Sequence, residues 1–319
     1  MILTITLNPS MDFIYTTNNF QTGHLNRFKN PARVVGGKGI NSGRTSAILG
    51  SDVIVTGVLA GMNGEHIAKL LETEKFISTF RFIGGETRNA ITIMHDNNCH
   101  TELVEEGPHV SKSVEKEIVS DILAICQKYP LIQTICLSGS ANTGNESFYA
   151  EVIQILKNEL HPSVRILADI SRHQLKNVLS ATEKPFFIKP NIHEFSELIS
   201  KEVHSKADVV ENLDYQGLAT IPLLMVSCGA EGAIVRYQGK IYDLTIPQIK
   251  LVNPTGSGDA TVGGIAYGLD QRLPIEDTLK YGMACGIANA METAVGFVQL
   301  ENVEALLKEI KIKEMIIPK

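Results

Sequence analysis

The chain has 319 residues, of which 44% are hydrophobic and 20% charged, and its formal net charge is −6 at pH 7. This composition is normal for a globular protein. The negative net charge gives no support to a nucleic-acid partner, which would need a basic surface, and no apolar run is long enough to span a membrane. The amino terminus lacks the features of a signal peptide, and the five cysteines are scattered without a CxxC pair, so we expect reduced thiols and a cytoplasmic location.

The first residues and the middle of the chain carry a strand–helix pattern. Leu3, Ile5 and Leu7 alternate with threonines, which is the period of a strand. From residue 53 onward, β-branched runs alternate with amphipathic segments, at 53–58 and 64–72, 132–138 and 145–158, 164–169 and 171–180, and 185–191 and 193–200. This alternation predicts right-handed βαβ units and a mostly parallel sheet with helices on both faces.

Two segments, near 11–35 and 79–105, interrupt the alternation and read as consecutive strands without helices. They can extend the main sheet in antiparallel fashion, or they can form a small β-lid over a cleft from two separate insertions. The residues alone leave both interpretations open.

The last third of the chain begins with two β-rich runs. These runs are residues 223–229 and 232–246. Gln238-Gly239 divides the second run, which predicts a hairpin turn at that point. Three helices are then predicted, over 258–269, 275–292 and 303–310.

Polar residues follow several of the predicted strands. They are Asn8, Asp12, Ser138, Asp169, Lys189 and Asn191. Ligands of open parallel sheets bind at the carboxyl ends of the strands. The set therefore predicts a polar cleft along one edge of the sheet.

A glycine-rich segment precedes the first of the three C-terminal helices. Gly256 and Gly258 flank Ser257, and Asp259 follows at the predicted helix start. Free amides at a helix amino terminus bind anions, and a carboxylate beside them can accept the proton of an attacking hydroxyl. The alternative is an ordinary helix start with an acidic first turn, and the loop alone does not decide between them.

No Walker A loop occurs in this chain. The segment at 36–39 reads GGKG, but Lys38 is followed by glycine where a Walker A loop has a hydroxyl residue. Phosphate binding, if present, must therefore use another arrangement.

A resemblance covers the whole chain and rests on eight motifs in order. They are TLNPSMD at 6–12, GGKGIN at 36–41, ETRNAI at 86–91, TELVEEGP at 101–108, LSGS at 137–140, KPNIHE at 189–194, VSCGAEGA at 226–233 and NPTGSGDA at 253–260. Together they resemble the ribokinase-like (phosphofructokinase B) carbohydrate kinases, in the branch of tagatose-6-phosphate kinases and 1-phosphofructokinases.

The resemblance implies one ribokinase-like kinase domain over residues 1–319. Its fold would be a three-layer αβα core with a mostly parallel sheet and a small β-lid, and the lid would join two copies as a homodimer. The implied reaction is ATP-dependent phosphorylation of a ketohexose phosphate with Mg²⁺, most closely tagatose 6-phosphate. The alternatives are fructose 1-phosphate as the substrate, or a non-catalytic phosphosugar sensor on the same scaffold.

The same resemblance implies a role for each matching residue. Asp259 would be the catalytic base, with Gly256, Ser257 and Gly258 forming the anion hole. Asp12, Gly37 and Asn41 would bind the sugar, and Lys38 and Arg88 its phosphate. The nucleotide would lie at Lys189, Ser227, Gly229, Glu231 and Gly232, and Asn191 and Glu194 would hold Mg²⁺ through water.

Several assignments stay open. We favour Arg88 over Lys38 for the substrate phosphate, because arginine offers a bidentate fork, while Arg27 and Arg33 in the first interrupted region are further candidates. Lys189 can contact the nucleotide or pair with Glu194. Two departures from the family pattern, ANTGNES at 141–147 and Arg172, fall near the expected sugar end, so the motifs do not decide the sugar.

Overall fold

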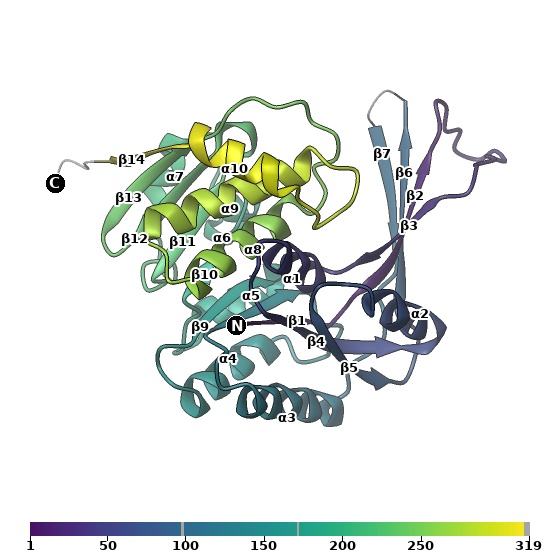
Figure 1. Cartoon of the computed structure of the whole chain (residues 1–319), viewed down its shortest axis with the longest axis horizontal. Helices are drawn as coiled ribbons and strands as arrows, with labels where there is room; N and C mark the ends of the chain where they lie inside the picture. Colours follow the sequence, from purple (N-terminus) through teal and green to yellow (C-terminus); the bar gives the residue numbers. More distant parts are fainter. Residues whose placement is uncertain (97–98, 171, 316–319) are drawn as a thin grey trace.

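The computed structural model of the protein describes residues 1–96, 99–170 and 172–315. The side chain of Arg172 lies outside this description, and with it the departure predicted at that position. Within the described residues, strands and helices alternate, and a large twisted sheet runs through the middle of the molecule (Figure 1).

The large sheet has 10 strands in the order β14-β13-β12-β11-β10-β9-β8-β1-β4-β5. Neighbours from β11 to β5 pair in parallel, while β12, β13 and β14 are added in antiparallel fashion. The mostly parallel sheet predicted from the alternation is therefore confirmed. The strands are β1 Ile2–Thr6, β4 Val53–Ala60, β5 Ile77–Ile83, β8 Thr134–Gly139, β9 Arg165–Ile170, β10 Phe187–Ile188, β11 Leu223–Ser227, β12 Ala233–Tyr237, β13 Lys240–Thr245 and β14 Lys311–Met315.

Helices cover both faces of this sheet and enclose two separate hydrophobic cores. One face carries α1 Lys38–Ile48, α2 Gly61–Leu71, α8 Ser257–Asp270, α9 Ile275–Ala290 and α10 Leu300–Glu309. The other carries α3 Lys112–Lys128, α4 Phe148–Glu159, α5 Arg172–Ser180, α6 Ile192–Ile199 and α7 Lys206–Asn212. Strand β1 is fully buried between them, with Leu3 and Ile5 in one core and Ile2 in the other. The three layers match the predicted αβα arrangement.

The hairpin and the C-terminal helices agree with the sequence pattern. Gln238 and Gly239 both have positive φ, at 47° and 76°, as a two-residue turn between β12 and β13 requires. The three predicted helices correspond to α8, α9 and α10, with ends that differ by up to three residues. Strand β14 was not predicted; it is formed by KIKEM at 311–315 and pairs with β13 at the edge of the sheet.

Helix α1 lies unusually close to β1 because glycines face the strand. A Cβ on Gly39 would meet Thr6 Oγ1 at 2.4 Å, and a Cβ on Gly43 would meet Thr4 Oγ1 at 2.9 Å. On its other side α1 contacts α8, where a Cβ on Gly263 would meet Ser42 O at 2.6 Å. The three elements thus pack at backbone distance.

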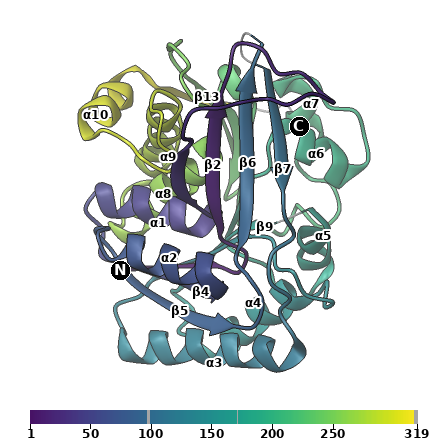
Figure 2. The same cartoon turned by 90° about the vertical axis from the view of Figure 1, so that its right-hand side faces the viewer.

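A second sheet of four strands, in the order β3-β2-β6-β7, stands beside the core (Figures 1 and 2). Its strands are β2 Ser10–Thr16, β3 Ala32–Gly36, β6 Arg88–His95 and β7 Cys99–Val104. It is separate from the 10-stranded sheet, so the strands within residues 10–36 and 88–104 do not extend the main sheet. The predicted start of the second insertion at residue 79 is wrong, however, because residues 77–83 form β5 of the main sheet, where β4 supplies a parallel neighbour.

A helix that spans a bilayer needs about 20 mostly apolar residues. No helix among the described residues is both long and apolar enough to cross a membrane.

Candidate active site

Helix α8 begins at the glycine-rich segment. Gly256 caps the helix with φ of 78°, a left-handed conformation that favours glycine. A Cβ at this position would also meet Val295 Cγ1 at 2.3 Å, so the neighbouring loop leaves no room for a side chain. The chain therefore enters α8 through a tight turn that requires glycine.

The first amides of α8 lack carbonyl partners. Ser257 N–H donates to Pro254 O at 3.2 Å, and Ala260 N–H donates to Gly256 O at 2.8 Å. Between them, the N–H groups of Gly258 and Asp259 form no hydrogen bond with a described residue. These two donors lie at the positive end of the helix dipole, where an anion is favoured.

Lys189 brings a positive charge to the same helix end. The residue follows β10 and is 7% exposed, and a Cβ on Gly258 would lie 3.0 Å from its Nζ atom. Lys189 forms no hydrogen bond or close ion pair with any residue that the structure describes, so it is not engaged by Glu194. A buried cation whose donors form no hydrogen bond, beside two free amides, is well suited to a phosphoryl group.

Asp259 is held by Asn41 across the interface of α1 and α8. Asn41 Nδ2 donates to Asp259 Oδ2 at 2.9 Å, and both residues are buried. Burial raises the pKa of Asp259 to about 6, and the charge of Asp169 adds to this effect, while Lys38, Lys189 and the hydrogen bond from Asn41 oppose it. A carboxylate with this pKa is ionised at neutral pH and can accept a proton.

Asp169, at the end of β9, is the acidic residue that links the two lysines. Lys38 Nζ lies 3.2 Å from Asp169 Oδ1 and 3.3 Å from Oδ2. Burial pushes the pKa of Asp169 upward, but Lys38 and Lys189 outweigh it and hold that pKa below its ordinary value. Asp169 thus stays charged and neutralises part of the positive field around Asp259. The sequence placed it among the strand-end residues but assigned it no role.

The predicted metal pair, Asn191 and Glu194, forms a capping box at the start of α6. Asn191 Oδ1 accepts from Glu194 N–H at 2.9 Å, and Glu194 Oε2 accepts from Asn191 N–H at 2.8 Å. Glu194 also lines a small cavity with Asp169 and Lys189. The described residues contain no cluster of three acidic, histidine or cysteine ligands. Mg²⁺ keeps several waters and takes one or two carboxylates, so this donor set fits a mostly hydrated Mg²⁺ better than a fully protein-bound metal.

The predicted nucleotide segment continues from the same strand ends. Ser227 ends β11 and forms a parallel bridge with Asn191, so it lies beside the start of α6. Gly229 and Glu231 are exposed in a single 3-10 turn, Gly229–Glu231. Gly232 is buried instead, with φ of 99° and only 2.0 Å between a Cβ and Leu244 O. The turn therefore requires glycine at position 232, and this buried residue offers no exposed surface to a nucleotide.

The amino acids that are predicted to bind the sugar lie at the base of the four-stranded sheet. Gly36 and Gly37 lead into α1, and a Cβ on Gly36 would meet Asp12 Oδ2 at 2.2 Å. Burial raises the pKa of Asp12, whereas the hydrogen bond from Ser10 and the charge of Arg88 lower it. Ser10 pairs with Arg88 in the parallel register of β2 and β6, so Asp12 and Arg88 share one face of this sheet.

Arg88 and Arg33 differ in the face that they occupy. Arg88 Nε donates to Asn8 O at 3.2 Å, which places its guanidinium at the end of β1. Arg33 pairs with Phe13 in the register of β2 and β3, and its guanidinium stacks 5.5 Å from that ring. Because side chains alternate along a strand, Arg33 faces away from Asp12 and Arg88. The geometry therefore places Arg88 and Arg33 on opposite faces of the sheet.

The ANTGNES segment follows β8 and is tied down at the same end of the sheet. Asn8 Nδ2 donates to Ser140 Oγ at 3.2 Å, and Asn142 Nδ2 donates to Gly107 O at 2.9 Å. Thr143 donates to the buried carboxylate of Glu115 on α3. The departure from the family pattern thus keeps a defined loop at the base of the four-stranded sheet.

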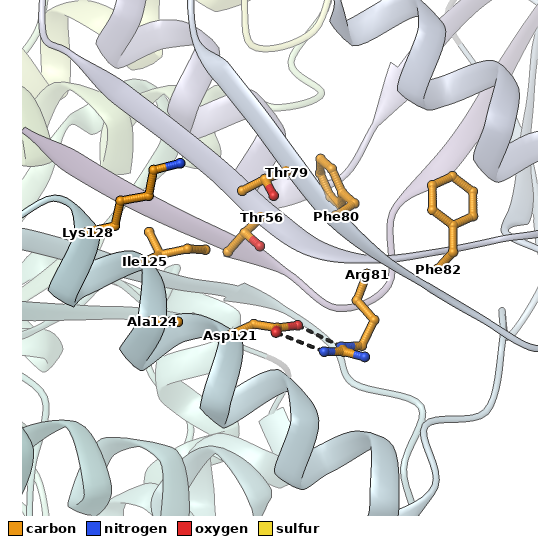
Figure 3. A pocket seen from close by; sticks show the side chains of 9 residues that line it. All are labelled: Thr56, Thr79, Phe80, Arg81, Phe82, Asp121, Ala124, Ile125 and Lys128. Atoms are coloured by element: carbon orange, nitrogen blue, oxygen red, sulfur yellow. Dashed lines mark hydrogen bonds and ion pairs between the residues drawn. The ribbon is translucent and has the colours of Figure 1, made fainter.

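A cavity of about 410 Å³ lies elsewhere, between β5 and α3 (Figure 3). Arg81 closes it on one side by pairing with Asp121, at 2.6 Å from Nε to Oδ2 and 2.8 Å from Nη2 to Oδ1. None of the predicted site residues lines it. The cavity is therefore distinct from the strand ends where those residues meet.

Neutralising Asp259 tests the energetic consequence of its burial. Its pKa in the folded protein, about 6, exceeds the ordinary 3.8, so its ionisation destabilises the fold above about pH 6. Asp259→Asn should raise the free energy of unfolding at pH 8 by on the order of 2–3 kcal/mol. The gain should shrink between pH 6 and 4, as measured by urea unfolding.

Asp208→Asn is the control for that measurement. Hydrogen bonds from the His204 amide and from Ser205 lower the pKa of Asp208, which caps α7 at the surface. Its replacement should lower stability at pH 8. A destabilised Asp259→Asn protein at pH 8 would contradict the cost assigned to the buried carboxylate.

Comparison with known proteins agrees with the geometry. A family model described as pfkB family carbohydrate kinase matches residues 4–300. A tagatose-6-phosphate kinase of Staphylococcus epidermidis is 36% identical over 317 residues, which cover 99% of this chain and 100% of the relative. A second strain of the same species has a tagatose-6-phosphate kinase with the same identity and coverage.

Solved structures share the fold. Phosphofructokinase-2 from Escherichia coli, in complex with potassium, has a TM-score of 0.85 at 22% identity, over 96% of this chain and 98% of that one. A Thermotoga maritima protein described as a possible 1-phosphofructokinase has a TM-score of 0.86 at 22% identity, over 99% of each chain. With the match to the family model and the full-length relatives, this chain belongs to the PfkB family of carbohydrate kinases.

Proposed function

We propose that the protein transfers a phosphoryl group from ATP to the 1-hydroxyl of tagatose 6-phosphate, giving tagatose 1,6-bisphosphate. The observation that carries the reaction is the arrangement at α8, where the carboxylate of Asp259 lies beside two free amides and the unpartnered Lys189. The sugar is supported by the tagatose-6-phosphate kinases that are 36% identical over the full length of this chain.

In this reaction Asp259 accepts the proton of the attacking hydroxyl. Asn41 holds the carboxylate through Oδ2, which leaves Oδ1 for the hydroxyl. The phosphoryl-transfer transition state is loose, so proton transfer occurs late and a carboxylate of ordinary to moderately raised pKa is sufficient. The pKa of about 6 keeps Asp259 ionised at neutral pH.

The negative charge of the migrating group is balanced at the end of α8. The amides of Gly258 and Asp259 donate to its oxygens, and Lys189 supplies a positive charge from the adjoining strand end. The amide of Ser257 is not free to donate to the migrating group, because it donates to Pro254 O. Its Oγ atom accepts from Asn289, so Ser257 helps to fix the turn. The proposed anion hole is thus centred on Gly258.

Asn191 and Glu194 would hold Mg²⁺ at the nucleotide end, through water. The ion held there would supply positive charge against the phosphate groups of the nucleotide. The protein's own contribution is the capping box, which fixes the Glu194 carboxylate at the mouth of the small cavity that Asp169 and Lys189 also line.

The four-stranded sheet acts as a lid over the sugar in this proposal. Asp12 would bind sugar hydroxyls and Arg88 the substrate phosphate, because both lie on one face at the base of the sheet. Lys38 is less suited to the phosphate, since Asp169 already engages its ammonium. A closed lid would exclude water and so limit the hydrolysis of ATP.

A coupled assay of ADP release tests the function. Tagatose 6-phosphate with ATP and Mg²⁺ should give turnover, and Asp259→Asn should reduce kcat by at least about 10²-fold while ATP binding is kept. Higher kcat/KM with fructose 1-phosphate would identify a 1-phosphofructokinase instead. If the protein bound these phosphosugars but turned over neither of them, the result would favour a non-catalytic phosphosugar sensor.

Arg88→Gln tests the phosphate site. Charge-assisted hydrogen bonds contribute enough that the KM for the phosphosugar should rise by roughly 10- to 100-fold, with the KM for ATP unchanged. Arg81→Gln is the matched control, because it removes the same charge from a β-strand arginine that lines the cavity between β5 and α3 instead. An unchanged KM for the phosphosugar in the Arg88 variant would show that another cationic residue binds the substrate phosphate.

We further propose that two copies associate through the lid. Its outer strand β7 exposes Leu103 and Val104 by 53% and 54%, which is unusual for apolar residues of an edge strand. Phosphofructokinase-2 of Escherichia coli has been solved as a tetramer in its inhibited form. Sedimentation should give twice the 34.9 kDa chain mass, and Val104→Lys should give monomers. A monomeric wild-type protein at micromolar concentration would refute the association.

A further inference from the structure

Arg44 is a buried arginine that no motif singled out. It lies on α1 three residues after Asn41, so both side chains project from the same face of the helix. Its guanidinium donates from Nη1 to Asn41 Oδ1 at 3.1 Å and to Val295 O at 3.0 Å, and from Nε to Glu74 Oε1 at 2.8 Å. Arg44 thus connects three segments that are distant in the sequence.

The contact with Asn41 decides which way the carboxamide points. A guanidinium can only donate, so the end of the amide that faces Arg44 must be the oxygen. The opposite end is then the NH₂ group, and it faces the carboxylate of Asp259 at 2.9 Å. A reversed amide would place its oxygen against the ionised carboxylate, with no proton between them.

Arg44 is itself fixed from two sides. Glu74 lies just after α2, and its carboxylate orients the guanidinium through Nε. Val295 lies in the loop after α9, and its side chain packs where Gly256 turns into α8. Gly296, the next residue, donates to Asn289 Oδ1 at 2.7 Å, while Asn289 Nδ2 donates to Thr255 O at 2.8 Å. The anchor of Arg44 therefore belongs to the same framework as the α8 turn.

We infer that Arg44 is a positioning residue for phosphoryl transfer, which acts through Asn41 by fixing the carboxamide so that its NH₂ group donates to Asp259. Arg44 does not touch either substrate in this role. The inference rests on the proposed function of Asp259 as the base. It extends that function by assigning the residue that orients the partner of the base.

The expected signature is a change in pH dependence rather than a uniform loss of activity. Lys38 of α1, Asp169 at the end of β9 and Lys189 after β10 are the charged groups that face Asp259, and all three remain in an Arg44 variant. The hydrogen bond from Asn41 lowers the pKa of Asp259, so its loss should move the acid limb of kcat to higher pH. A hydrogen bond to a charged group corresponds to about one pKa unit.

Arg44→Met, which keeps a long apolar stem but no donor, is the test variant. Its kcat should fall about fivefold at pH 6 and by less than about 1.5-fold at pH 8, because the acid limb moves by about one unit. The KM values for phosphosugar and ATP should stay within about twofold of the wild type, since only the ionisation of the base changes. An equal loss at both pH values, or an unshifted acid limb, would overturn the inference.

Arg236→Met is the matched control for loss of a largely enclosed guanidinium. Arg236 donates to the carbonyl oxygens of Leu218, Ala219 and Ile221, none of which belongs to the α8 turn. Its replacement should lower thermal stability as the Arg44 change does, but leave the acid limb in place. A shift of the limb in this variant would show that destabilisation alone produces the signature.

A double-mutant cycle separates action through Asn41 from other effects. If Arg44 acts through the carboxamide, Arg44→Met should cause no further shift in an Asn41→Ala background. Additive shifts would contradict this route.

The pH dependence of unfolding gives a readout that does not require turnover. The difference in the free energy of unfolding between Arg44→Met and Arg44→Met/Asp259→Asn should keep growing to a higher pH than in the corresponding pair with Arg44 present, because only the folded-state pKa of Asp259 has moved. This result can be obtained even if Asp259→Asn keeps activity, in which case the proposed base fails while the positioning by Arg44 stands.

Discussion

The site depends on how closely α1 lies between β1 and α8. Gly39 and Gly43 let the helix approach the strand, and Gly263 lets α8 approach the helix, each at a distance that would not accommodate a Cβ. This packing brings the side chain of Asn41 to the carboxylate of Asp259, two residues separated by 218 positions in the chain. A larger residue at any of these glycines would separate the elements and break the hydrogen bond that defines the site.

Charge is balanced within a small volume around this contact. Two carboxylates, Asp259 and Asp169, and two ammonium groups, Lys38 and Lys189, come from four different elements. Asp169 engages Lys38 and shares the field of Lys189, so the lysine nearest to α8 keeps its donors free. The result is a carboxylate with raised pKa beside an unpaired cation and two unpaired amides. Such an arrangement costs stability, which is typical of sites built for catalysis rather than for folding.

The four-stranded sheet carries Asp12 and Arg88 beside the main sheet and joins one hydrophobic core through Met11 and Val35. Its base is anchored where β1 ends, through Arg88 and Asn8, and where α2 begins, through the Glu86 carboxylate that accepts from the amides of Met62 and Asn63. Its outer strand β7 is largely exposed. A sheet that is fixed at one end and exposed at the other can serve both as a cover for the cleft and as a contact surface.

The local patterns in the sequence were sufficient for the elements and for much of the site. Strand and helix periods gave the αβα layers, because those periods follow from which face is buried, and Gly256 to Asp259 could be read as a helix start with a carboxylate because that chemistry is contiguous. The roles of Asp169, Asn289 and Arg44 could not be read in this way. Each depends on a partner from another element: Lys38 for Asp169, the turn before α8 for Asn289, and Asn41 together with Val295 for Arg44. The boundary of the second insertion was likewise decided by the pairing of β5 with β4, which no local pattern encodes. The sequence by itself determined the layers and the contiguous motifs, whereas the tertiary structure alone decided which charges meet and which end of the Asn41 amide faces Asp259. Hydrogen bonds between distant segments exist only once those segments are packed together.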